Sequence, residues 1–292
     1  MRKYASPLTV LVMNRGDRLF RRDLFRHLET LNLGEIVWIG SRTMSADVEE
    51  VSRDFPRIRF ILIREELGGG ELVNIGVRES RAPALLAMWS DMRILSMPKA
   101  QSPHDAEEVL CLLPLLKNRA QEALPSIQSP AWKKGRLVVK FHTPSRDGEP
   151  ALFPFDYCGI YQKQKFLQTG GFDPAISNAY WQKMDFGFRC HLWGEKMAVT
   201  TALTLEYSRQ GPSEDSTPDE SYKLFYLKNL AVRVRSEAGE IPWWRVFTYM
   251  ARSGGWPAAA VKEFSQARGW VKVNGSRFKR SHKDVIDSWG AR

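Results

Sequence analysis

An acidic residue stands just beyond an apolar run near residue 90. The run "ALLAMW" covers residues 84–89, and Asp91 follows it after a single serine. A carboxylate that projects from the end of a buried strand can bind a metal ion or a polar ligand, since hard divalent cations prefer oxygen ligands. A carboxylate in this position can equally do no more than end the strand. The residue types alone leave both readings of Asp91 open.

Apolar and amphipathic segments alternate over the first 95 residues and would position this carboxylate. We expect strands at 8–14, 35–40, 58–63 and 84–89, with helices within 21–34, 45–56 and 71–81 between them. This alternation predicts an α/β protein with a mostly parallel sheet flanked by helices. Ligands of such proteins gather at the carboxyl ends of the strands, where Asn14, Ser41 and Asp91 are expected.

The pattern changes after residue 95. The segment "DAEEVLCLLPLLKNR", residues 105–119, is typical of a helix interrupted at Pro114, and "RLVVKFHT" at 136–143 is typical of a strand. A Gly-Gly turn at 170–171 precedes a helix that we expect to begin close to Asp185. A polar loop at 208–221 separates these elements from a further helix.

Composition limits the classes to which the chain can belong. Its 292 residues, 43% of them hydrophobic, are enough for one substantial core. No apolar stretch approaches the roughly 20 residues that a membrane-spanning helix needs. The three cysteines are scattered and lack the CxxC spacing of a zinc site, which predicts reduced thiols in a cytoplasmic protein.

The net charge of +10 is concentrated at the C-terminal end. Residues 241–292 contain ten Lys and Arg against three acids, so we divide the chain into a domain at 1–240 and a basic helical extension at 241–292. Trp243, Trp244 and Phe247 lie on one face of an expected helix in this extension, and a second helix is expected from Pro257. Aromatic residues beside basic ones predict contact with an anionic membrane surface. Packing of the aromatic face on the domain is the alternative.

Five short motifs occur in an order that resembles the GT-A glycosyltransferases, especially the inverting family 2 type. The resemblance covers roughly residues 6–235 and implies a GT-A-like nucleotide-diphospho-sugar transferase fold. Its motifs are Asn14-Arg15, Asn74-x-Gly76, "WSD" at 89–91, "GGFD" at 170–173 and "MDFGFRCHLWG" at 184–194.

The resemblance implies roles for two carboxylates. Asp91 falls on the second acid of a degenerate Asp-x-Asp motif, in which Trp89 replaces the first acid, and would bind Mg²⁺ or Mn²⁺. Asp185 falls on the second acid of a Glu-Asp pair, in which Met184 replaces the first, and would be the catalytic base that takes the proton of the acceptor hydroxyl. An acid at a helix start, stabilised by the helix dipole, is the alternative for Asp185.

Six further residues would bind the substrates. The resemblance assigns contacts with the nucleotide-sugar donor to Asn14, Arg15, Asn74, Gly170 and Gly171. The indole ring of Trp181 could stack on an acceptor sugar. The alternatives are a loop exit for Asn14-Arg15, an ordinary turn for the two glycines and a core position for Trp181.

These observations predict a glycosyltransferase that moves a sugar, with inversion, from a nucleotide-sugar donor to a glycan, lipid-linked or protein acceptor, as in polysaccharide biosynthesis for the cell envelope. We expect it in the cytoplasm, peripherally bound to the inner face of the membrane. The missing acids of two motifs favour a different class, a catalytically degenerate protein that binds a sugar or a partner. The basic extension would also suit a nucleic-acid-binding protein, but no nucleic-acid motif accompanies it, so no nucleic acid is expected as a partner.

Overall fold

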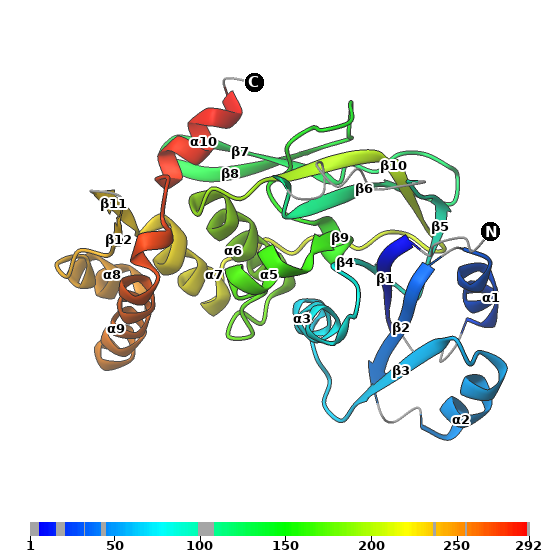
Figure 1. Ribbon diagram of the computed structural model, residues 1–292. Helices are drawn as coiled ribbons and strands as arrows, with labels where there is room; N and C mark the ends of the chain where they lie inside the picture. The colour runs from blue at the N-terminus through cyan, green and yellow to red at the C-terminus, as the bar shows by residue number, and fades with distance from the viewer. Residues whose placement is uncertain are drawn as a thin grey trace.

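A computed structural model of the chain describes residues 6–15, 21–31, 33–41, 45–98, 108–235, 238–254 and 256–290 (Figure 1). Its main feature is an eight-stranded sheet with the strand order β3-β2-β1-β4-β9-β6-β10-β5. These strands are β1 (Ser6–Met13), β2 (Leu33–Ser41), β3 (Ile58–Ile63), β4 (Ala84–Trp89), β5 (Met92–Ser96), β6 (Cys111–Lys117), β9 (Gly159–Gln162) and β10 (Met197–Tyr207).

The first half of the sheet is the predicted parallel unit. β1 lies between β2 and β4 and pairs with both in parallel, and β2 pairs with β3 in the same sense. The connecting helices are α1 (Arg22–Thr30), α2 (Ser45–Asp54) and α3 (Gly69–Glu79). Every residue of β4 is buried, as expected for a central strand covered on both faces. The predicted alternation of strands and helices is confirmed.

The second half of the sheet is mixed. β9 runs antiparallel to β4 and β6, β6 is parallel to β10, and β5 is antiparallel to β10. The helix predicted over residues 105–119 was wrong, because residues 111–117 form strand β6. Pro114 is tolerated there because it lies where the register of β10 shifts between Thr200 and Thr204, so the ladder is already interrupted.

A hairpin and several helical segments accompany the second half of the sheet. The hairpin is formed by β7 (Ile127–Lys133) and β8 (Arg136–His142), which confirms the strand expected at 136–143. A 3₁₀ turn at Phe155–Tyr157 precedes β9. The helices are α5 (Lys163–Thr169), α6 (Ala179–Leu192), α7 (Glu220–Phe225) and a π-helical turn at Tyr226–Leu230.

The C-terminal part is helical apart from a small hairpin. β11 (Arg233–Arg235) pairs with β12 (Ala238–Glu240), and α8 (Arg245–Ser253), α9 (Pro257–Val273) and α10 (His282–Gly290) follow. In Figure 1 α8 and α9 lie beside α6 and α7, at the opposite end of the molecule from β1–β3. The predicted helix start at Pro257 is confirmed, with proline in the first turn, where its missing N–H costs nothing. Among the described helices, none combines the length and the apolar character needed to span a bilayer.

The C-terminal helices share a hydrophobic core with residues before position 240. Tyr249, Phe264 and Phe278 belong to the same buried cluster as Phe188 of α6 and Phe225 of α7. A separate cluster surrounds the sheet. The domain boundary at 240 stays a prediction, but no gap in packing marks it within the described residues, because the second cluster crosses it.

Candidate functional site

The carboxyl ends of β1 and β4 form one polar corner. The N–H of Ser90 donates to the Met13 carbonyl at 2.8 Å, and the N–H of Arg15 donates to Ser90 Oγ at 3.2 Å. Ser90 Oγ also donates to Asn14 Oδ1 at 3.3 Å. Asn14 and Arg15 therefore lie beside the loop that carries Asp91. Parallel pairing of β1 with β4 brings these residues together, as the sequence predicted.

Arg15 bridges two carboxylates at this corner. Its Nη2 lies 3.1 Å from Asp91 Oδ1 and 2.8 Å from Asp156 Oδ2, and its Nη1 donates to Asp156 Oδ1 at 3.1 Å. The guanidinium also lies 4.4 Å from the ring centre of Trp89, within the range of a cation–π interaction. Burial lowers the pKa of Arg15, but the charges of Asp156 and Asp91 outweigh this effect and raise it overall. Arg15 is therefore always charged here.

Asp156 reaches this corner from the 3₁₀ turn before β9. It is 5% exposed, and it has φ of 49°, followed by Tyr157 with φ of 62°. Two successive non-glycine residues in the left-handed region are strained, and strain of this kind clusters at functional sites. The turn is held by the Trp89 indole N–H, which donates to the Asp156 carbonyl, and by the Tyr207 hydroxyl, which donates to Asp156 Oδ2, both at 2.8 Å.

One oxygen of Asp91 is free to bind a cation. Only Asp91 Oδ1 has a partner among the described residues, and the side chain is 14% exposed. Together, Arg15, Asp91 and Asp156 carry a net charge of −1. Within the described part of the chain no three His, Cys, Asp or Glu side chains form a preformed metal site. Mg²⁺ is commonly held by one or two carboxylates together with substrate phosphates, and Asp91 fits that mode.

A cleft of about 730 Å³ adjoins Asp91 on the side of α1. Met92, which follows Asp91, lines it together with Ser208, whose N–H donates to the Asp91 carbonyl at 2.8 Å. Arg21, Arg22 and Arg93 also line this cleft, together with Asp23. Arg22 is paired with Glu50 and Asp54, so Arg21 and Arg93 are the cations that the cleft offers.

The Gly-Gly turn is fixed from two sides. Gly170 and Gly171 have φ of 83° and 71°, a region that favours glycine. The Asn74 amide donates to the Phe172 carbonyl at 2.8 Å, and Asn74 Oδ1 accepts from the Phe172 N–H at 2.9 Å. Both polar atoms of the Asn74 side chain are thus engaged with the turn, and the residue is buried. This geometry makes Asn74 a clamp for the turn, and its contact with the nucleotide-sugar donor stays a prediction.

Asp185 does not lie at the start of a helix, so that expectation was wrong. It is the seventh residue of α6, is 0% exposed, and pairs with Arg189 at 3.1 Å. Asn229 donates to its other oxygen at 2.7 Å. Arg189 in turn donates to the carbonyls of Thr169 and Gly171. Both oxygens of Asp185 are thus engaged inside the protein, and its role as the catalytic base stays a prediction.

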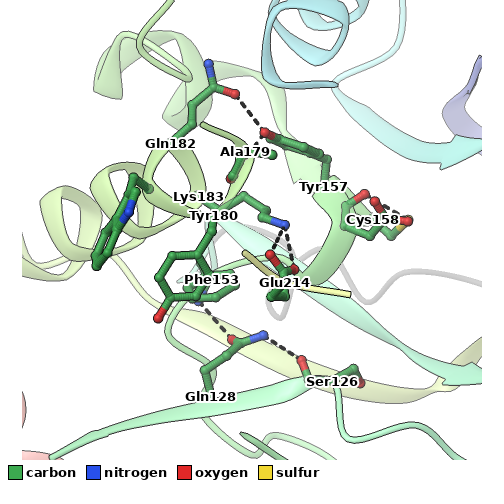
Figure 2. Close-up of polar contacts among 12 residues, drawn as sticks. Ser126, Gln128, Phe153, Tyr157, Cys158, Ala179, Tyr180, Gln182, Lys183 and Glu214 are labelled. Carbon is green, nitrogen blue, oxygen red and sulfur yellow. Dashed lines mark hydrogen bonds and ion pairs between the residues drawn. The ribbon is translucent and has the colours of Figure 1, made fainter. Parts of the chain in front are cut away.

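A different carboxylate, Glu214, is connected to the Arg15 corner through Lys183 and Tyr157. Both of its oxygens accept hydrogen bonds from Lys183 Nζ, at 2.6 and 2.8 Å. Figure 2 shows the Lys183 ammonium group pointing from α6 towards Glu214, next to Tyr157. Lys183 Nζ lies 5.1 Å from the Tyr157 ring centre, and Asp156 precedes Tyr157 in the chain. Glu214 itself is only partly buried, with a side chain that is 12% exposed.

Glu214 lines a large cleft of about 1110 Å³, and Trp181 lines the same cleft. Trp181 is 7% exposed, donates its indole N–H to the Thr217 carbonyl at 2.9 Å and stacks on Phe225 at 5.4 Å. Most of this side chain is therefore core, with one edge on the cleft. The acceptor role and the core role that the sequence left open are compatible in this position.

Sequence reasoning missed Asp156, Lys183 and Glu214. Asp156 lies between aromatic residues in "PFDYCG", and a lone acid in so apolar a segment was a usable signal that its side chain has a buried partner. No comparable signal exists for Glu214, which belongs to a polar loop that contains several acids.

Comparison with known proteins supports the fold. No protein-family model matches the sequence, and neither does any curated protein. Among solved structures, GalNAc-T7 with UDP, GalNAc and Mn²⁺ superposes with a TM-score of 0.62 at 11% identity, covering 100% of this chain and 57% of that one. TarS from S. aureus superposes with a TM-score of 0.50 at 12% identity, covering 95% of this chain and 44% of that one.

The chain has the GT-A fold. Both neighbours are glycosyltransferases of this fold, and the mainly parallel sheet with flanking helices is common to them. The chain spans about half the length of these proteins. At such low identity the likeness establishes architecture, and the activity must be argued from the residues of the site.

Proposed function

We propose that this protein is a glycosyltransferase that moves a sugar from a nucleotide-diphosphate donor to a glycan, a lipid-linked or a protein acceptor. The observation that carries the proposal is the cluster of Arg15, Asp91 and Asp156 at the carboxyl ends of β1 and β4. GalNAc-T7, which shares the fold, was solved with UDP, GalNAc and Mn²⁺. A charged cluster at the switch from one half of the sheet to the other suits a nucleotide donor.

The donor binds at this corner with its diphosphate towards Asp91. Asn14 and Arg15 orient Asp91 through Ser90 and the ion pair, and Arg93 and Arg21 supply positive charge along the adjoining cleft. Asp91 would hold Mg²⁺ or Mn²⁺ through the carboxylate oxygen that does not pair with Arg15, together with oxygens of the diphosphate. When bound, this cation neutralises charge on the leaving nucleotide.

Glu214 replaces Asp185 as the group that accepts the proton of the attacking hydroxyl. It is the only acid among the described residues that line the large cleft. Each of its oxygens has a second lone pair beyond the bond to Lys183, so it can also accept a hydrogen bond from an acceptor. Attack from this cleft, on the face of the sugar away from the departing nucleotide, would invert the anomeric carbon.

Residues 241–292 bring the enzyme to an anionic membrane surface, on the cytoplasmic side. Trp243, Trp244 and Phe247 are 61%, 46% and 58% exposed, and Trp256 is 85% exposed. Exposed aromatic side chains in a basic segment are suited to the interface between water and lipid headgroups. The buried side of the same helices packs on the body of the protein, which leaves the exposed aromatic residues for the membrane contact that we propose.

The proposed function is tested with a panel of UDP- and GDP-sugars incubated with Mn²⁺ or Mg²⁺ and the full-length protein. Slow hydrolysis of one donor, seen as release of the nucleoside diphosphate, is expected even without the acceptor. Glu214→Gln is expected to lower transfer by about 10²–10⁴-fold and to leave donor binding unchanged. Glu220→Gln, an exposed acid on α7, is the matched control.

Loss of folding must be separated from loss of activity in this experiment. Glu214→Gln leaves the Lys183 ammonium without its counterion, and a buried unpaired charge is destabilising. The double variant Lys183→Met/Glu214→Gln removes both charges and should melt like the wild type. Transfer at the wild-type rate in a folded variant would exclude Glu214 as the base.

A second candidate function is sugar binding without catalysis. It is favoured by the enclosed position of Asp185 and by Met184 at the other position of the expected acidic pair. In that case donors bind and stabilise the protein, but no nucleotide is released with any metal.

A further inference from the structure

The large cleft is built by elements from both ends of the second half of the chain. Its walls come from the β7–β8 hairpin, the start of α6, the loop before α7, the π-helical turn, β11 and the first residues of α10. Its volume of about 1110 Å³ exceeds that needed for one sugar ring and is at the upper end of small-molecule sites. A cleft of this size can hold several units of a chain.

The charge in this cleft is strongly one-sided. The cations that line it are Arg136, Arg233, Arg235, Arg245, Arg252 and Lys283. The single acid, Glu214, is already neutralised by Lys183. His282 adds no charge at neutral pH, because burial together with Arg245 and Lys283 lowers its pKa. The cleft therefore presents several positive charges with no compensating negative charge of its own among the described residues.

Five of these six cations lack an ion-pair partner among the described residues. Arg235 alone forms a salt bridge, with Glu240, and Arg136 and Arg252 are exposed. Like charges that converge on one cleft without counterions repel each other, which costs free energy in the unbound protein. A ligand that carries negative charge removes this repulsion, so its binding is favoured over that of a neutral ligand of the same shape.

Aromatic side chains line the same cleft as the cations. Trp132 is 39% exposed at the end of the hairpin, and Tyr222, Tyr226 and Trp181 also line the cleft. Flat aromatic faces pack on the C–H faces of sugar rings, while arginine binds carboxylate or phosphate oxygens in a bidentate manner. The two kinds of side chain together suit a ligand that has both sugar rings and acidic groups.

We infer that the acceptor is an acidic glycan, with uronate or phosphate groups along its chain, that lies in this cleft with its growing end at Glu214. The inference rests on the proposed function, since it identifies the acceptor of that reaction. An anionic lipid surface fits less well, because the cations line a hollow and not a flat face. Single-stranded nucleic acid shares the charge, and it becomes one outcome of the test.

The test measures binding, not transfer, so it is independent of activity. Affinities of the full-length protein are determined at low salt for four probes of matched length: an oligogalacturonide, a phosphomannan fragment, a neutral malto-oligosaccharide and single-stranded DNA. At least one acidic glycan is expected to bind about tenfold or more tightly than the neutral one, with affinity that falls as salt is added.

Charge-matched variants locate the site. Arg136→Ala/Arg252→Ala should weaken binding of the acidic glycan by about tenfold or more, since each arginine forms charge-assisted hydrogen bonds. The control Arg119→Ala/Arg146→Ala removes two exposed arginines that do not line the cleft and should bind like the wild type. Both double variants should retain the melting temperature and the thermal stabilisation by UDP or GDP.

Three results would overturn the inference. They are equal affinity for acidic and neutral glycans, equal loss of affinity in the two double variants, and tighter binding of single-stranded DNA than of either acidic glycan. Failure of the proposed function has a different signature, since donor nucleotides would then give no thermal stabilisation whatever the glycan binding.

Discussion

Asp185 and Arg189 form a buried ion pair one turn apart in α6, and Arg189 extends that pair to the carbonyls of Thr169 and Gly171. The pair therefore ties α6 to the Gly-Gly turn, which Asn74 holds from the side of α3. Two of the residues expected at the substrates, Asn74 and Asp185, thus act on one turn of the main chain.

Asp185→Asn is expected to destabilise the protein by about 3–5 kcal/mol, because it leaves the fully buried Arg189 guanidinium without its counterion. Differential scanning calorimetry measures this as a lower melting temperature. Asp23→Asn, which changes an exposed acid on α1, should melt within a degree or so of the wild type. A folded, equally stable Asp185→Asn protein that has lost all transfer would instead restore Asp185 as the base.

Asp91→Asn is expected to remove the effect of metal on donor binding. In the wild type, Mn²⁺ should enlarge the rise in melting temperature caused by UDP or GDP, since the cation joins Asp91 to the diphosphate. The asparagine variant should keep its fold and its response to nucleotide alone, but lose the increment due to metal. Asp287→Asn, an exposed acid on α10, serves as the control. An unchanged metal increment in Asp91→Asn would mean that Asp91 only ends the strand.

The two glycines of the turn should differ in their tolerance of alanine. A Cβ at Gly171 would collide with the Asn74 amide oxygen, whereas a Cβ at Gly170 has open space around it. Both positions have positive φ, so each substitution carries a backbone cost of about 1 kcal/mol. Denaturant titration should show a clearly larger loss for Gly171→Ala than for Gly170→Ala. Equal losses of stability in the two variants would mean that the Asn74 side chain can move aside at little cost.

His282 should make stability fall in mild acid. Burial and the nearby Arg245 and Lys283 lower its pKa below the unfolded value of about 6.5. Between the two values the unfolded state binds more protons, so the free energy of unfolding decreases as pH drops through this window. Urea titrations at pH 7.5 and 5.5 should show a smaller decrease for His282→Gln than for the wild type. Identical decreases would remove His282 from the pH response.

The triple variant Trp243→Ser/Trp244→Ser/Phe247→Ser should reduce sedimentation with anionic vesicles. These side chains are exposed, so the melting temperature should hardly change. Binding of the wild type should weaken at high salt without vanishing, because screening acts on the basic residues and not on the aromatic ones. Deleting residues 241–292 is a poor substitute for this variant, because it would open the core around Phe264 and Phe278. Wild-type sedimentation of the triple variant would refute the membrane contact.

Local patterns in the sequence determined the first half of the fold. Strands β1 to β4 were predicted from short apolar runs, and their helices from apolar residues at helical spacing, each ended by turn residues. Such preferences act over a few neighbouring positions. The same reasoning placed Asn14, Arg15 and Asp91 at one edge, because parallel pairing of successive strands brings their ends together. The same reasoning failed for residues 111–117, because this leucine-rich run lacks the periodicity that would distinguish a buried strand from a helix.

Only the tertiary structure decided which acidic side chains are exposed to solvent and which form ion pairs with arginine. Asp156 joins Arg15 across 141 positions, and Asn74 joins Phe172 across 98. The burial of Asp185 depends on which residues pack around α6, and no local sequence pattern indicates those residues. A carboxylate has the same intrinsic chemistry at every position, so its role is set by desolvation and by the charges that folding brings within a few ångströms of it. These are properties of the packed chain and not of any segment.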